Sequence, residues 1–159
     1  MNPHPEIAYL VSGLDEAFDR RSWHGTNLFG SLRSLDVALA TWRPAPGRHN
    51  IWEIAVHAAY WKYAVWRAVT GVPRGSFALK GSNWFPRSVP DEAALQADLR
   101  LLKEQHVAMR EAVMNLSPRR LHSLVPGRQI RFAFMIRGAA AHDLYHAGQI
   151  QLLKRLHQL

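Results

Sequence analysis

The sequence predicts an all-α protein, a four-helix bundle with a short extra N-terminal helix. Apolar residues recur at steps of three and four along most of the chain, which is typical of helices with one buried face. No stretch alternates apolar and polar residues for long enough to indicate a strand. Residues typical of helix ends bracket the longer apolar segments. With 159 residues, the chain is expected to form a single domain over 1–159.

Five helical segments are expected, over about residues 5–20, 27–43, 51–70, 91–116 and 131–157. The first has one apolar face that ends at Phe18, before the break Ser22-Trp23-His24-Gly25-Thr26. The second begins near Asn27, carries Leu at steps of three and four, and ends at Pro44 and Pro46.

The third segment has clear signals at both ends. Asn50 is a favourable N-cap, and Glu53 three residues later forms a pattern like a capping box. Gly71 and Pro73 indicate the end. Ser88 and Asp91 are expected to open the fourth helix. The connections 71–90 and 117–130 are long for a bundle, so one of them is expected to cross over and make neighbouring helices parallel.

Composition excludes several classes of protein. Apolar residues make up 48% of the chain and include six Trp, so the chain is not disordered. No apolar run approaches the roughly 20 residues of a membrane span, and the N-terminus lacks the pattern of a signal peptide. The chain has no Cys, which excludes disulfides and thiolate catalysis. We expect a cytoplasmic protein.

The net charge of +8 indicates an attraction for anions. Most of the basic residues are Arg, which favours recognition of carboxylates or phosphates. They are spread over the whole chain, with no basic tail and no striped helix. Small acidic molecules are therefore the preferred partners, and nucleic acid is the less favoured alternative.

Four histidines fall on core-facing stripes of three expected helices. His57 lies on the third helix, His106 on the fourth, and His142 and His146 on the last. The spacing of His142 and His146 places both rings on one side of a helix, so that they can bind one ion. At about 1.5 Å per helical residue, His57 lies about 20 Å from the C-terminal end of its helix. His142 and His146 lie roughly 16–22 Å from the start of the last helix. If these two helices are antiparallel, the three rings meet at the same depth.

Three neutral imidazoles would hold a divalent metal ion and leave one position open for water or substrate, as in catalytic zinc sites. The alternative is that the histidines are separate, hydrogen-bonded core residues. If the fourth helix runs parallel to the third, His106 lies about 13 Å deeper than His57, which is too far to share the ion. His106 is therefore interpreted as a core or site-lining residue.

Two segments of the chain resemble the DinB-like superfamily, also called the YfiT/DinB metalloenzyme-like proteins. The segments are HDLYHAGQIQLLKR at 142–155 and HNIWEIAVHAAYW at 49–61, and WHGTNL at 23–28 resembles the start of the first bundle helix in one branch. The resemblance implies an up-down-down-up four-helix bundle, usually a homodimer. It also implies zinc or nickel bound by three histidines, whose matching positions are His57, His142 and His146.

The resemblance further implies a metal-dependent enzyme, such as a thiol-dependent S-transferase or a hydrolase. Its site would activate water or a low-molecular-weight thiol toward a small acidic or electrophilic substrate. His24, His106 and Gln149 are candidate supporting residues, although His24 also fits a capping role and Gln149 a polar contact in a dimer. The alternative is a non-catalytic, dimeric binding or stress-response protein with a vestigial metal site.

Overall fold

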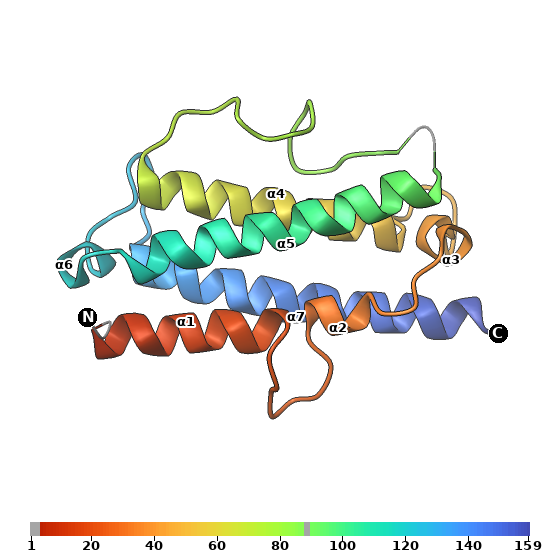
Figure 1. The fold of residues 1–159 in the computed structure, drawn as a ribbon, viewed down its shortest axis with the longest axis horizontal. Helices are drawn as coiled ribbons and strands as arrows, with labels where there is room; N and C mark the ends of the chain where they lie inside the picture. The colour runs from red at the N-terminus through yellow and green to blue at the C-terminus, as the bar shows by residue number, and fades with distance from the viewer. Residues whose placement is uncertain (1–3, 88–89) are drawn as a thin grey trace.

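A computed structural model of the chain describes residues 4–87 and 90–159. Most of these residues are helical (Figure 1), which confirms the all-α class. The helices are α1 (Pro5–Phe18), α2 (Leu28–Ser31), α3 (Val37–Thr41), α4 (Ile51–Thr70), α5 (Glu92–Met114), α6 (Pro118–Leu121) and α7 (Phe132–His157).

The four long helices α1, α4, α5 and α7 lie alongside one another (Figure 1). Helix α4 packs against α5 and α7, and α1 packs against α7 and α5. In Figure 1, α4 and α5 run toward the same end of the molecule, and α1 and α7 run the opposite way. The N-terminal helix is therefore not an extra element: its 14 residues are one of the four long helices.

The expected single helix over 27–43 is wrong. The chain forms α2 and α3 instead, joined by a turn in which Ser34 has a left-handed φ of 56°. The Asp36 side chain then accepts a hydrogen bond from the Leu39 backbone N–H at 2.8 Å and starts α3. Three of the four leucines that suggested a helix are still buried: Leu28, Leu32 and Leu35.

The ends of α4 follow the sequence signals. The Asn50 side chain accepts a hydrogen bond from the Glu53 backbone N–H at 2.8 Å, and Gly71 ends the helix with a left-handed φ of 80°. Asp91 caps α5 in the same way as Asn50 caps α4. Ser88, the other expected opening residue, lies outside the described residues.

The two long connections differ from each other. Residues 71–87 and 90–91 contain no helix, as expected from their Gly and Pro content. The connection from α5 to α7 begins with the one-turn helix α6. Pro118 stands at the first position of α6, where its missing N–H costs no hydrogen bond.

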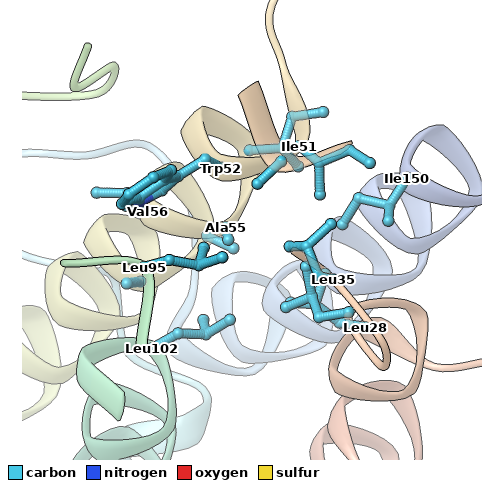
Figure 2. Close-up of a cluster of buried hydrophobic side chains, with 14 of the residues drawn as sticks. Leu28, Leu35, Ile51, Trp52, Ala55, Val56, Leu95, Leu102 and Ile150 are labelled. Atoms are coloured by element: carbon cyan, nitrogen blue, oxygen red, sulfur yellow. The ribbon is translucent and has the colours of Figure 1, made fainter. Parts of the chain in front are cut away.

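Two apolar clusters fill the interior, one toward each end. Figure 2 shows the first cluster, in which side chains of α4 such as Trp52 and Val56 meet side chains of α2, α5 and α7. The second cluster joins α1 to the other ends of the long helices. Buried polar residues lie along α4, α5 and α7 between the two clusters: His57, Lys62, His106, Asp143 and His146.

None of the described helices combines the length and the apolar character that a membrane crossing requires.

Candidate metal centre

The structure brings His57, His142 and His146 together at the middle of the α4–α7 contact. One nitrogen from each ring lies within 4.8 Å of the others. The Nε2 atom of His142 is 3.2 Å from that of His57 and 3.0 Å from that of His146. His57 and His146 are buried, and His142 is half-buried. Because α4 and α7 run in opposite directions (Figure 1), residues near the middle of each helix meet at one depth.

Hydrogen bonds at Nδ1 fix the orientation of two of these rings. The Nδ1–H of His57 donates to the Asn83 carbonyl oxygen at 2.8 Å, and the Nδ1–H of His146 donates to Gln149 Oε1 at 2.7 Å. In a neutral imidazole that donates from Nδ1, Nε2 carries a lone pair. Two lone pairs therefore face the Nε2 atom of His142, which carries at most one proton.

The three rings are neutral at pH 7. Burial lowers the pKa of His57 to about 4 and the pKa of His142 to about 3. Burial also lowers the pKa of His146. Neutral imidazoles with converging lone pairs are the donor set that Zn²⁺ and Ni²⁺ accept, so the residues present fit a divalent cation.

The connection after α4 supports His57 through two neighbouring residues, Asn83 and Trp84. Asn83 accepts from His57 with its backbone oxygen and from the Trp61 Nε1–H with its side chain at 3.0 Å. The Trp84 ring stacks on His57, with ring centroids 3.9 Å apart, and on His49 at 3.5 Å. Trp84 therefore covers one face of the His57 ring.

A buried ion pair of Lys62 and Asp143 joins α4 to α7 next to the histidine cluster. Asp143 follows His142 in sequence, and the pair is almost completely buried, with side chains 2% and 1% exposed. Burial lowers the pKa of Lys62 and raises the pKa of Asp143, and the charge of each partner opposes that shift in the other. Sequence reasoning did not predict the burial of this pair, because charged residues are usually expected at the surface.

His106 is buried but does not join the cluster. Its ring stacks on Phe18 with centroids 3.8 Å apart, and its Nε2 lies 3.8 Å from Asp15 Oδ1. Its Nδ1 is buried and, among the described residues, has no hydrogen-bond partner. His106 is thus a core residue of the α1–α5 contact.

His24 lies in the loop between α1 and α2 and is exposed, so the structure does not bring it to the cluster. Trp23 beside it is 99% exposed. Gln149, by contrast, contacts His146 directly. Of the candidate supporting residues, Gln149 alone touches one of the three rings.

A cavity of about 210 Å³ begins at His142 and extends between α4 and α7 toward the loop before α7. The Lys62–Asp143 pair lines it next to His142, and Arg128 lines it in that loop. Most of the remaining lining consists of apolar side chains. The histidine cluster is therefore reachable from one side.

The fold and the cluster define a class: an all-helical protein in which three histidines from two antiparallel helices converge. The model of the DinB superfamily matches residues 20–150, and the chain belongs to that family. Comparisons with curated proteins and with solved structures gave no match.

Proposed function

We propose that this DinB-superfamily protein binds a divalent metal ion, zinc or nickel, through His57, His142 and His146. We further propose that it is a metal-dependent enzyme of the thiol-dependent S-transferase or hydrolase type. The proposal rests above all on the convergence of three Nε2 atoms, two of which carry lone pairs because their rings donate from Nδ1. Without a cation, a proton on His142 satisfies only one of those two lone pairs.

When bound, the cation would act as a Lewis acid and lower the pKa of a water or of a low-molecular-weight thiol. The chain's own residues prepare the site for this chemistry. Asn83 and Gln149 hold the rings of His57 and His146 with Nε2 toward the centre. Since the chain contains no Cys, a thiol would have to be a separate cofactor.

The cavity at His142 favours an enzyme over the non-catalytic alternative. A vestigial site would be capped by side chains, with no space for a second molecule beside the rings. Here the half-buried ring of His142 lines a cavity of about 210 Å³. A small electrophilic substrate can therefore reach the cluster.

A homodimer is supported by the exposed face of α7. Tyr145, Gly148 and Leu152 recur on this face at steps of three and four, and Tyr145 and Leu152 are large and exposed. A Cβ added at Gly148 meets no other atom within 4 Å. Because Gly148 relieves no crowding within the chain, we propose that it permits close approach of the same face of a second copy.

Three further proposals concern the chain as a whole. The four long helices form the up-down-down-up bundle, which the helix directions in Figure 1 support. Residues 1–159 form one domain, which the packing of α1 against α7 and α5 supports. The cytoplasmic location remains a prediction from the sequence.

The enzymatic proposal is tested with protein loaded with zinc or nickel. Transfer of a small thiol to an electrophile and hydrolysis of an activated ester are measured side by side. Turnover of either substrate is expected from the loaded protein and not from His142→Ala, while Arg119→Gln, an exposed change on α6, retains it. Bound metal without any turnover would support the non-catalytic alternative.

A further inference from the structure

The cavity beside His142 has two chemically distinct parts. Its walls are mainly apolar: Trp61, Ala64, Val65, Ile130, Phe134 and Met135. Its charged groups are the Lys62–Asp143 pair and Arg128. Because Lys62 and Asp143 neutralise each other in a direct ion pair, Arg128 contributes the one uncompensated charge of the lining.

Arg128 is available to an anionic ligand. Its side chain is exposed, and in residues 4–87 and 90–159 no carboxylate lies within 4.0 Å of its guanidinium. A guanidinium offers several N–H donors in a plane, which suits a carboxylate, sulfonate or phosphate. The cavity therefore prefers a ligand with a negative charge at the Arg128 end.

A second hollow strengthens this preference. It shares Ala64 and Arg128 with the first, and Arg67 and Arg74 also line it, without any acidic residue. Three arginines thus line the hollow that adjoins the Arg128 end of the apolar cavity. Such a positive rim attracts anions and orients them with the charge outward.

The volume limits the apolar part of the ligand. A cavity of roughly 150 Å³ accommodates a benzene molecule. The cavity here measures about 210 Å³. It has space for one six-membered ring or a branched alkyl group of that size, with a short substituent.

We infer that this cavity is the substrate site, and that the substrate is a small organic anion with one ring-sized apolar body. The anionic group lies at Arg128, the apolar body lies between α4 and α7, and the reactive end faces His142. The reactive role of that end rests on the proposed function, whereas the binding of the anion does not require a metal.

The inference is tested by fluorine NMR titration of the purified protein with para-fluorobenzenesulfonate. Sulfonates coordinate metals weakly, so the titration reports the cavity rather than the histidines. The matched ligands are para-fluorophenyl methyl sulfone, which lacks the charge, and trifluoromethanesulfonate, which lacks the ring. We expect para-fluorobenzenesulfonate to bind about tenfold more tightly than either, because each lacks one of the two interactions. Equal binding of all three ligands would overturn the inference.

Variants locate the binding site. Arg128→Gln should weaken para-fluorobenzenesulfonate about tenfold and leave the neutral sulfone unchanged, while Arg119→Gln, an exposed change that lines neither hollow, changes nothing. Ala64→Phe should fill the cavity and weaken both aromatic ligands. If circular dichroism shows that Ala64→Phe does not fold, Ala139→Phe replaces it. Unchanged affinity in Arg128→Gln, or in a folded cavity-filling variant, contradicts the assignment.

His146→Ala separates this inference from the proposed function. The variant should lose metal and still bind para-fluorobenzenesulfonate in an Arg128-dependent manner. If wild type binds the sulfonate at Arg128 but takes up no metal, the cavity assignment stands and the metal proposal fails. Metal uptake without sulfonate binding overturns the cavity assignment alone.

Discussion

The carbonyl oxygen of Asn83 accepts a hydrogen bond from His57 Nδ1 at 2.8 Å and so ties the connection after α4 to the middle of that helix. Asn83 has a left-handed φ of 67°, a conformation that Asn adopts more readily than most residues. Its side chain also binds Trp61. One turn thus sets both the orientation and the tautomer of a candidate metal ligand.

Changing the backbone preference at position 83 should change metal affinity. Asn83→Gly keeps the left-handed conformation and the carbonyl acceptor, so we expect an affinity close to that of wild type. Asn83→Ile disfavours this conformation and should weaken binding by about tenfold or more, as loss of an outer hydrogen-bond partner does. Competition with a coloured chelator measures both. Equal affinities for the two variants would show that the Asn83 contact does not orient His57.

Removing one partner of the Lys62–Asp143 pair should destabilise the fold strongly. Asp143→Ala leaves a buried, unpaired ammonium group, and a loss of about 3–5 kcal/mol in the free energy of unfolding is expected. The double variant Lys62→Met/Asp143→Leu removes both charges and should recover most of that loss. Urea unfolding at pH 7 measures all three proteins. A double variant as unstable as Asp143→Ala would contradict this explanation.

Acid should destabilise the metal-free protein. Burial lowers the pKa of His57 to about 4 and that of His106 to about 2, the latter with help from Lys62 and Arg110. In the unfolded chain a histidine has a pKa of about 6.5. Below that pH the unfolded state binds more protons, so the free energy of unfolding falls as pH drops from about 6.5 toward the folded pKa values.

The contribution of His106 can be isolated. Each histidine that is protonated only in the unfolded state contributes a slope of about 1.4 kcal/mol per pH unit. His106→Leu removes one such group, so its unfolding free energy should fall less steeply between pH 6 and pH 4. Urea titrations of the metal-free proteins at several pH values test this. Parallel pH profiles for wild type and His106→Leu would argue against a neutral, buried His106.

If the exposed face of α7 forms the dimer contact, one charge placed on that face should disrupt the dimer. Gly148→Glu adds a carboxylate at a position where a Cβ meets no atom within 4 Å in the single chain. The variant should therefore fold normally and elute as a monomer, while wild type elutes as a dimer. Gly13→Glu on α1 is a matched control because its Cβ also meets nothing within 4 Å. Light scattering after size exclusion distinguishes the two states, and a wild type that is monomeric at micromolar concentration contradicts the dimer.

Local signals predicted the long helices well because they act within a few residues. Helix α4 begins after Asn50, whose side chain caps it, and ends at Gly71, which is left-handed. Both residue types can be recognised in the sequence. The prediction of a single helix over 27–43 failed because apolar spacing does not distinguish one helix from two short helices joined by a turn. Asp36 was the neglected signal, since a good N-cap residue inside an expected helix indicates a new start.

The position of the three histidines could be anticipated from helical spacing and depth, because one turn and one antiparallel contact suffice to bring them together. The groups around them could not. Asn83 lies in a connection without periodicity, and its contact with His57 depends on the path of the whole segment. The Lys62–Asp143 pair joins residues 81 positions apart in sequence, and no local rule links them.

The metal content of the purified protein shows whether the three histidines hold a cation. Protein purified without an affinity tag is loaded with zinc or nickel, dialysed and analysed by elemental mass spectrometry. We expect about one ion per chain for wild type and for His106→Ala, and background levels for His57→Ala, His142→Ala and His146→Ala. Wild type at background, or equal loss in His106→Ala and in the three cluster variants, would contradict the proposed metal site.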